Sequence, residues 1–116
     1  MFVKANEMRE ETRENMRGGK GSVYFRHPVA DKADLPAKCR LFAEIIVPTG
    51  ASMGYHEHMG ETEFYYILEG TGILDDGKNR TPLNPGDTVV TGNGGGHSVE
   101  NESGKDLKML ACIVLD

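Results

Sequence analysis

Apolar and polar residues alternate along several short stretches of the chain, which is the pattern of half-buried β-strands. The alternation is clearest between Arg40 and Val47, where every second residue is aliphatic. Further on, Glu63, Tyr65 and Ile67 share one face of a strand, and the residues between them share the other face. We therefore predict strands over residues 22–26, 40–47, 63–68, 88–91 and 107–115.

Turn residues separate these stretches. The segment 75–78 contains Asp-Gly, which accepts the positive φ angles of a tight hairpin turn. The segment 84–87 places Pro and then Gly at the two middle positions of a type II turn. Short strands separated by such turns indicate an all-β protein, either an antiparallel sandwich or a barrel.

The N-terminal residues have a different composition. Residues 6–16 are rich in Glu, Arg, Asn and Met, and we predict a short helix there with its two methionines on one side. The run from Asn15 to Gly21 ends this helix, because glycine loses much conformational entropy in any regular element. No repeat or linker divides the chain. We expect residues 1–116 to form one domain, with residues 1–21 as an N-terminal arm.

The overall charge and the cysteines limit the possible functions. The 116 residues carry a formal net charge of −5, which argues against nucleic-acid binding and against anionic membrane surfaces. No stretch approaches the roughly 18 consecutive apolar residues of a transmembrane helix. The N-terminus becomes charged too early for a secretory signal, and Cys39 and Cys112 form no C-x-x-C motif. We expect a cytoplasmic protein with two reduced thiols rather than a cross-strand disulfide.

Three of the four histidines lie in two short segments, together with one glutamate. His56 and His58 are two residues apart, so on an extended strand both side chains leave the same face. Glu63 follows after a short loop, and His97 follows a strand and a glycine-rich turn. Imidazole is the commonest metal ligand. An H-x-H pair by itself is about as often the polar outer face of a strand, so the surrounding residues decide the interpretation.

Both segments resemble the two sequence motifs of the cupin superfamily. The first motif reads Gly, five residues, His-x-His, three or four residues, Glu, six residues and Gly. The second reads Gly, five residues, Pro-x-Gly, two residues, His, three residues and Asn. The matching residues are Gly50, His56, His58, Glu63 and Gly70 in segment 50–70, and Gly86, Gly94, His97 and Asn101 in segment 86–101. Gly92 stands where the family usually has Pro, which puts the rigidity of that loop in question.

The resemblance implies a fold and a metal site. The fold is the cupin double-stranded β-helix, a jelly-roll barrel. The implied ligands of one divalent ion are His56, His58, Glu63 and His97. The family favours Mn(II) or Fe(II), and Ni, Co, Cu and Zn remain open because imidazole and carboxylate donors accept them all. Two free positions on the ion would suit a bidentate ligand such as a dicarboxylate, a hydroxy acid, a diketone or O₂.

Several residues near these ligands are candidates for substrate contacts. Tyr65 shares the inward face with Glu63, so its phenol can reach a substrate, although a buried tyrosine more often bonds to the backbone. Arg26 and Arg40 are candidates to bind a carboxylate through two hydrogen bonds. The alternative for such an arginine is a neighbouring glutamate at the rim, as Glu44 is for Arg40.

Glu57 and Glu61 flank the ligands and are candidate general acids by position alone. The segment 15–21 also resembles small bacterial cupins labelled oxalate-decarboxylase-like. Three functions stay open: a Mn-dependent lyase acting on oxalate or a similar small carboxylate, an Fe-, Zn- or Ni-dependent oxygenase or sugar isomerase, and a non-catalytic module for a small anion. We favour the first. Small cupins commonly pair, and the half-apolar outer face of segment 64–68 leads us to expect a homodimer.

Overall fold

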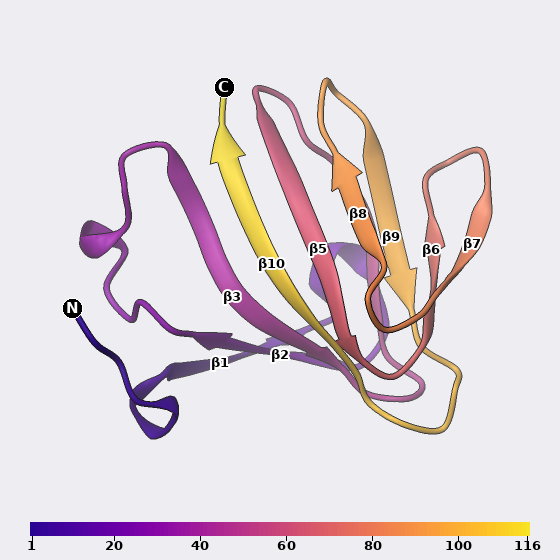
Figure 1. Ribbon diagram of the computed structural model, residues 1–116. Helices are drawn as coiled ribbons and strands as arrows, with labels where there is room; N and C mark the ends of the chain where they lie inside the picture. Colours follow the sequence, from indigo (N-terminus) through magenta and orange to yellow (C-terminus); the bar gives the residue numbers. More distant parts are fainter.

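The computed structural model describes residues 1–116, which fold into two antiparallel β-sheets (Figure 1). The ten strands are β1 (Arg9–Glu14), β2 (Ser22–His27), β3 (Cys39–Val47), β4 (Ser52–Glu57), β5 (Glu61–Glu69), β6 (Gly72–Asp75), β7 (Arg80–Leu83), β8 (Thr88–Thr91), β9 (Gly96–Glu100) and β10 (Leu107–Leu115). The larger sheet has the order β1-β2-β3-β10-β5-β8, and the smaller has the order β4-β9-β6-β7. The predicted all-β, double-sheet architecture is confirmed.

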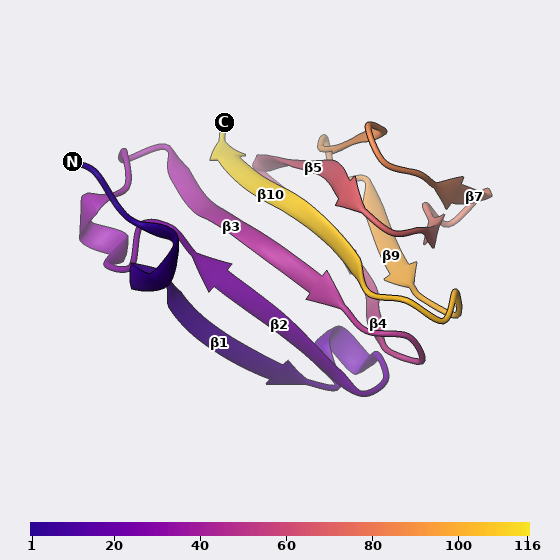
Figure 2. The ribbon, with the colours of Figure 1, turned by 60° about the horizontal axis from the view of Figure 1, so that its bottom comes forward.

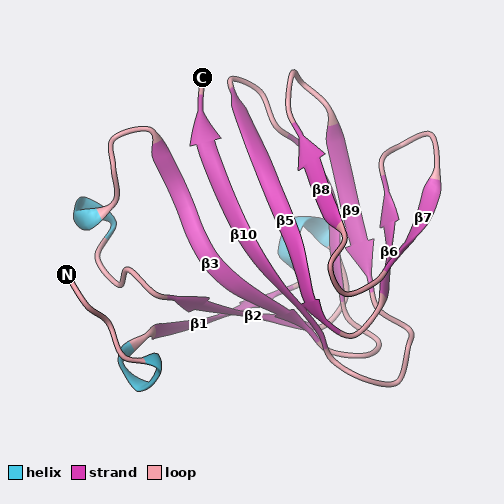
Figure 3. Cartoon of the chain, in the orientation of Figure 1, coloured by secondary structure: helices cyan, strands magenta, loops and turns pink.

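The helical content is limited to three single turns of 3₁₀ helix, η1 (Ala5–Glu7), η2 (Met16–Gly18) and η3 (Lys32–Asp34), as Figure 3 shows. None of them has the length and hydrophobicity needed to span a membrane. The strands predicted at 88–91 and 107–115 match β8 and β10. Loops therefore join strand to strand directly, and the core is made by the inner faces of the two sheets.

Alternation decides which side chains enter that core. In β5, Tyr65 and Ile67 are each 1% exposed, whereas the side chains of Phe64 and Tyr66 face outward. The same alternation in β3 and β10 places aliphatic residues from both strands in one buried cluster. Burying such side chains contributes roughly 1.5–3 kcal/mol each to folding. The faces predicted for residues 63–68 are confirmed.

The short helix predicted over residues 6–16 is wrong. Most of that segment is strand β1, which pairs with β2 in a register that runs from Arg9 opposite His27 to Glu14 opposite Ser22. The segment has almost no apolar side chains with a helical period, so no helix face is available for burial. Pairing with the edge of a sheet satisfies its backbone groups, and tertiary structure overrides the weak local propensity.

Strands β1 and β2 extend the larger sheet past β3, and Figure 2 shows β1, β2, β3 and β10 side by side. The loop from Asn15 to Gly21 joins the two strands and reaches β4 of the smaller sheet. The N-terminal residues therefore contribute to both layers. This position brings their side chains to one end of the space between the sheets.

The two cysteines are free thiols and half-buried, as the sequence predicts for reduced residues. Cys39 begins β3, and Cys112 lies in the neighbouring β10. Burial raises the pKa of the Cys112 thiol, and the adjacent Cys39 raises it further. Cys112 is therefore a poorly reactive thiol at neutral pH.

Candidate metal centre

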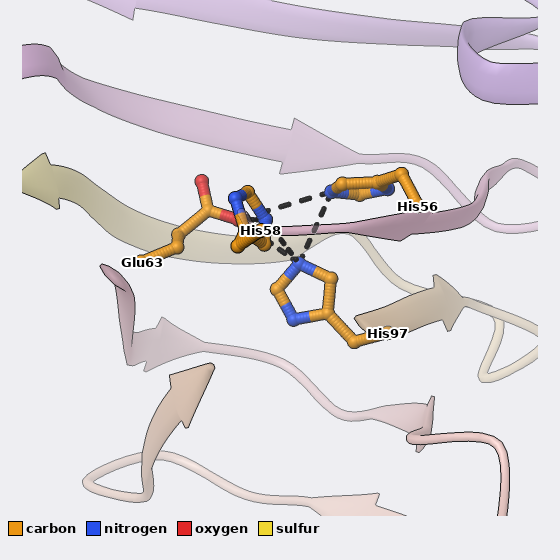
Figure 4. A group of neighbouring side chains, drawn as sticks. All are labelled: His56, His58, Glu63 and His97. Atoms are coloured by element: carbon orange, nitrogen blue, oxygen red, sulfur yellow. Dashed lines mark hydrogen bonds and ion pairs between the residues drawn. The ribbon is translucent and has the colours of Figure 1, made fainter. Parts of the chain in front are cut away.

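Four side chains from three strands and one loop meet between the sheets (Figure 4). His56 lies in β4, His58 directly after it, Glu63 in β5 and His97 in β9. Their potential ligand atoms all lie within 4.8 Å of one another. The side chains of His58, Glu63 and His97 are at most 4% exposed, and that of His56 is 8% exposed. The structure thus brings together the four residues predicted to bind metal.

The spacing of these atoms fits one divalent ion. The Nε2 atom of His97 lies 3.1 Å from that of His56 and 3.2 Å from that of His58. The Oε1 atom of Glu63 lies 2.9 Å from His97 Nε2, 3.0 Å from His58 Nε2 and 3.9 Å from His56 Nε2. On an octahedral ion with bonds of ~2.1 Å, adjacent ligands lie ~3.0 Å apart and opposite ligands ~4.2 Å apart. The cluster can therefore hold one metal ion.

Glu63 shows why these atoms need a cation. Its Oε1 atom is buried and accepts no hydrogen bond, despite the imidazole nitrogens around it. Burial alone would raise the pKa of the Glu63 carboxyl, but the neighbouring His56 and His97 lower it to about 2. The carboxyl group is therefore ionised at neutral pH. A buried, ionised and unpaired oxygen is costly by itself, and a bound divalent ion removes that cost.

Two of the histidines are oriented by partners that can only accept a hydrogen bond. His56 Nδ1 lies 2.9 Å from the carbonyl oxygen of Gly54, and His58 Nδ1 lies 2.6 Å from a carboxylate oxygen of Glu61. In both rings Nδ1 must carry the proton and donate it. Nε2 then keeps its lone pair and faces the centre of the cluster, which is the tautomer that metal binding requires.

His97 is the most deeply buried of the three rings. Its Nδ1 atom lies 2.9 Å from the hydroxyl of Thr91, and its ring stacks on Tyr65 at a centroid distance of 4.9 Å. Burial lowers the pKa of His97, partly offset by Glu63, so the neutral, ligating form is favoured. Tyr65 OH lies 3.3 Å from His97 Nε2. The phenol therefore borders the centre without being one of the four clustered ligands.

A bulge in β4 aims His56 at the cluster. Met53 pairs with Val99, but His56 pairs with His97, so β4 has one residue more than β9 over this interval. His56 and His58 therefore do not share a face through simple alternation along one strand, as their two-residue spacing predicts. The two histidines still converge, because His58 leaves β4 and continues into a loop.

The glycine loop 92–96 holds His58 in place. The His58 backbone N–H donates to Gly95 O, and the Gly94 N–H donates to His58 O, both at 2.9 Å. Gly92, at the motif's Pro position, accepts a hydrogen bond from the Gly95 N–H at 2.9 Å. A Cβ on Gly92 would lie 2.6 Å from Thr62 Oγ1. The loop is therefore tied down by hydrogen bonds, and close packing favours glycine over proline.

A cavity of about 170 Å³ opens on the metal cluster and extends to the N-terminal strands. Tyr65 lines it beside the cluster, on the inward face that strand alternation predicts. Positive charge dominates its lining although the whole chain has a net charge of −5. The cationic residues around it are Arg9, Arg13, Arg17, Lys32 and Arg40, and the carboxylates are Glu11 and Glu63. Low-dielectric walls strengthen such a field, so the cavity favours an anionic ligand.

The two predicted carboxylate-binding arginines have carboxylate partners within the chain. Arg26 does not line the cavity and pairs with Glu44 at 3.0 Å. Arg40 lines the cavity, but its guanidinium makes two hydrogen bonds to Glu61, at 2.9 and 2.8 Å. The suggestion that Arg40 pairs with Glu44 is wrong, because β3 places Glu44 next to Arg26 and Lys108.

The two predicted general acids lie outside the cavity lining. Glu57 is exposed. Glu61 lies behind His58, where the Arg40 guanidinium lowers the pKa of its carboxyl despite some burial. Because it stays ionised, the Glu61 carboxylate orients the metal-binding residue His58 and has no proton to donate.

The sequence argument missed the cavity wall built by β1 and β2. His27 is 5% exposed and its Nε2 lies 2.8 Å from Glu11, while the Arg13 guanidinium lies 4.0 Å above the ring of Phe25. The sequence carries only a partial signal: if the segment is a strand, Arg9 and Arg13 share one face, and Glu10 and Glu14 share the other. A strand would therefore separate these two arginines from two of the three glutamates.

Comparison with known proteins agrees with this fold and site. The cupin domain family matches residues 43–113, and the chain belongs to this family. A Thermotoga maritima protein named as oxalate-binding is 44% identical over 115 residues, which cover 99% of this chain and 94% of the relative. A T. maritima crystal structure described as a predicted oxalate decarboxylase is 43% identical over the full length of both chains, with a TM-score of 0.92.

More distant structures share the fold alone. The crystal structure of a Silicibacter pomeroyi sugar phosphate isomerase from the cupin superfamily has a TM-score of 0.79 at 17% identity, covering 100% of this chain and 76% of that one. The polyketide cyclase RemF of Streptomyces resistomycificus has a TM-score of 0.80 at 19% identity, covering 100% and 80%. One fold thus carries different activities, and function must be argued from the site.

Proposed function

We propose that this cupin binds one divalent ion, with Mn(II) favoured, at His56, His58, Glu63 and His97, and a small dicarboxylate such as oxalate beside it. The observation that carries the proposal is the cationic cavity that opens on the metal cluster in an otherwise acidic chain. The oxalate-binding name of the T. maritima relative supports the same ligand class.

The donor set accepts several divalent metals. Three imidazoles and one carboxylate can bind Mn(II), Fe(II), Co, Ni, Cu or Zn, so the ligands do not select the metal, and the preference for Mn(II) comes from the resemblance to cupins labelled oxalate-decarboxylase-like. A bound ion would act as a Lewis acid toward the carboxylates of the ligand. The chain supplies an ionised Glu63, two rings held with Nε2 inward, and a cavity wall that attracts the anion.

The size of the cavity limits the ligand. About 170 Å³ is well below the ~300–1,000 Å³ of pockets that hold drug-sized molecules. A compact dianion fits such a space. Tyr65 is fully buried, and burial raises the pKa of its phenol well above the ordinary value, with a further contribution from Glu63. The phenol keeps its proton and can donate a hydrogen bond to a ligand oxygen.

Calorimetry of the Mn(II)-loaded protein tests the proposal. We expect oxalate to bind, acetate to bind at least about tenfold more weakly because it lacks the second charge, and His97→Ala to lose oxalate binding. The control is Glu57→Gln, which changes an exposed residue next to the cluster that does not line the cavity. The proposal fails if oxalate neither binds nor is consumed while a sugar acid or a diketone is.

Decarboxylation of oxalate is the second candidate, favoured by the description of the T. maritima structure as a predicted oxalate decarboxylase. The carbon–carbon bond breaks, CO₂ leaves, and the electron pair on the remaining carbon takes a proton to give formate, with no net oxidation. In the cavity, Tyr65 is the residue that holds a transferable proton beside the cluster. We expect Mn(II)-dependent formate release that falls in Tyr65→Phe, while oxalate affinity changes less.

We also propose a homodimer formed through the outer face of the larger sheet. Large apolar side chains are exposed on this face. They lie on the adjacent strands β10, β5 and β8 and, beyond β3, on β2: Val114, Phe64, Tyr66, Leu68, Val90 and Tyr24. The register places Phe64 opposite both Val90 and Cys112, so these side chains lie on one continuous surface. A twofold partner would remove this surface from water.

A further inference from the structure

The loop from Asn15 to Gly21, here called the arginine loop, is strained at the residue that faces the cavity. Arg17 has φ 54° and ψ 32°, and Asn15 has φ 50°, so both occupy the left-handed region. Asparagine tolerates this region, but arginine adopts it only at a cost in free energy. Such strain persists where the surroundings hold the backbone, and it is concentrated at functional sites.

Close packing against β4 holds the arginine loop in this conformation. A Cβ on Gly54 would overlap the backbone carbonyl oxygen of Arg17, and a Cβ on Gly19 would overlap that of Ser52. The Ser52 N–H donates to Lys20 O, and the Lys20 N–H donates to Ser52 Oγ, both at 2.9 Å. The two glycines thus let the two backbones touch.

This contact also places Arg17 next to a metal ligand. The carbonyl of Gly54 accepts the hydrogen bond from His56 Nδ1, so the residue that supports the arginine loop also orients His56. Arg17 and His56 both line the cavity. An arginine side chain anchored at this point reaches the same space as a ligand bound at the cluster.

Arg17 differs from the other arginines of the cavity because it has no partner. Arg9 and Arg13 pair with Glu11, and Arg40 pairs with Glu61. The Arg17 guanidinium makes no hydrogen bond or ion pair with any residue of the chain, and neither does the Lys32 ammonium. Arginine is better suited than lysine to a carboxylate, because its planar fork donates two parallel hydrogen bonds.

We propose that Arg17 is a specificity-determining residue that pairs with the carboxylate oxygens of the ligand that face away from the metal cluster. This assignment rests on the proposed function, because it takes the ligand to be a small dicarboxylate. Arg17 gives a dianion a second anchor that a monoanion cannot use. The strain in its backbone is the cost of presenting the guanidinium at this position.

The decisive variant is Arg17→Gly, because glycine adopts the left-handed conformation without strain. We expect its melting temperature to equal or exceed that of the wild type, while its affinity for oxalate falls about tenfold to a hundredfold, as loss of a charged hydrogen bond predicts. Acetate affinity and metal content should not change. Arg17→Gln, which keeps the length but not the charge, should lose oxalate affinity to a similar extent, and Arg17→Lys should lose less.

The matched control is Lys20→Ala, which removes a cation from the same loop that does not line the cavity and leaves its backbone hydrogen bonds in place. Oxalate affinity should be unchanged in this variant. If Arg17→Gly binds oxalate as tightly as the wild type, the role of Arg17 is refuted and the proposed function stands. If the metal-loaded wild type does not bind oxalate at all, the proposed function and the role of Arg17 are both refuted.

Discussion

The two ends of the cavity are built in different ways. At the metal end, four buried side chains come from residues 56–97, and neighbouring groups hold each imidazole with Nε2 inward. At the other end, β1, the arginine loop and β2 supply mostly half-exposed or exposed charged side chains. The comparison teaches that two short sequence motifs can assemble the metal cluster, whereas the wall of the cavity beside it comes from segments far away in the chain.

The two ends also carry complementary charge. Glu63 makes the metal end a site for a cation, and the surplus of arginines makes the rest of the cavity a site for an anion. A metal-bound dicarboxylate satisfies both ends at once. The proposed function therefore depends on both ends, and variants can separate them.

The largest effect should come from removing a ligand at the metal end. His58→Ala should lower the metal content from about one ion per chain to less than about a tenth, because one imidazole of the set is lost. His27→Gln, at the opposite end, should keep its metal. Elemental analysis of the purified proteins measures both, and equal metal content in the wild type and His58→Ala would refute the site.

A smaller effect on metal binding should follow from removing Glu61, the hydrogen-bond partner of the metal-binding residue His58. Glu61→Ala leaves His58 Nδ1 without its carboxylate, and such losses reduce metal affinity by about 10- to 100-fold. Glu57→Ala, which removes an exposed glutamate close by, is the control and should not change affinity. Competition with a chelator gives both dissociation constants. An unchanged value for Glu61→Ala would show that His58 needs no such support.

At the N-terminal end of the cavity, lowering the pH should remove the contribution of Glu11 to folding stability. A hydrogen bond from Arg13 lowers the pKa of this carboxyl from 4.5 to about 2. The folded state therefore binds this proton less readily than the unfolded state, so the stabilisation is complete above pH 4.5 and is lost as the pH falls through about 2. The difference in melting temperature between the wild type and Glu11→Gln should shrink over this range. Thr12→Ser, on the exposed face of β1, removes no titrating group and should show no such trend.

The smallest effect on metal binding and on oxalate binding should come from breaking the proposed dimer. Tyr66→Glu places a charge in the proposed interface, outside the cavity, and should halve the mass measured by light scattering at micromolar concentration. Metal content and oxalate affinity should stay as in the wild type. A wild-type mass equal to that of one chain would refute the dimer. A loss of oxalate binding together with dimerisation would show that the two faces of the sheet are coupled.

Much of the metal end follows from the sequence, because its information is local. The two-residue period predicts β3, β5, β8 and β10 and the inward face of Tyr65. The resemblance of segments 50–70 and 86–101 to the cupin motifs predicts the cluster, whereas the spacing of His56 and His58 alone leaves a polar outer face as the alternative. The bulge in β4 changes the path of the chain without changing this outcome.

The arrangement of the N-terminal end of the cavity is determined only by the tertiary structure. Residues 9–14 become a strand because β2 offers them an edge, and Arg40 bonds to Glu61 because the fold brings them together across 21 residues. Arg17 lines the cavity because two glycines far apart in the chain let two backbones touch. Ion pairs and close backbone contacts depend on which segments meet and in what register, and no local pattern contains that information.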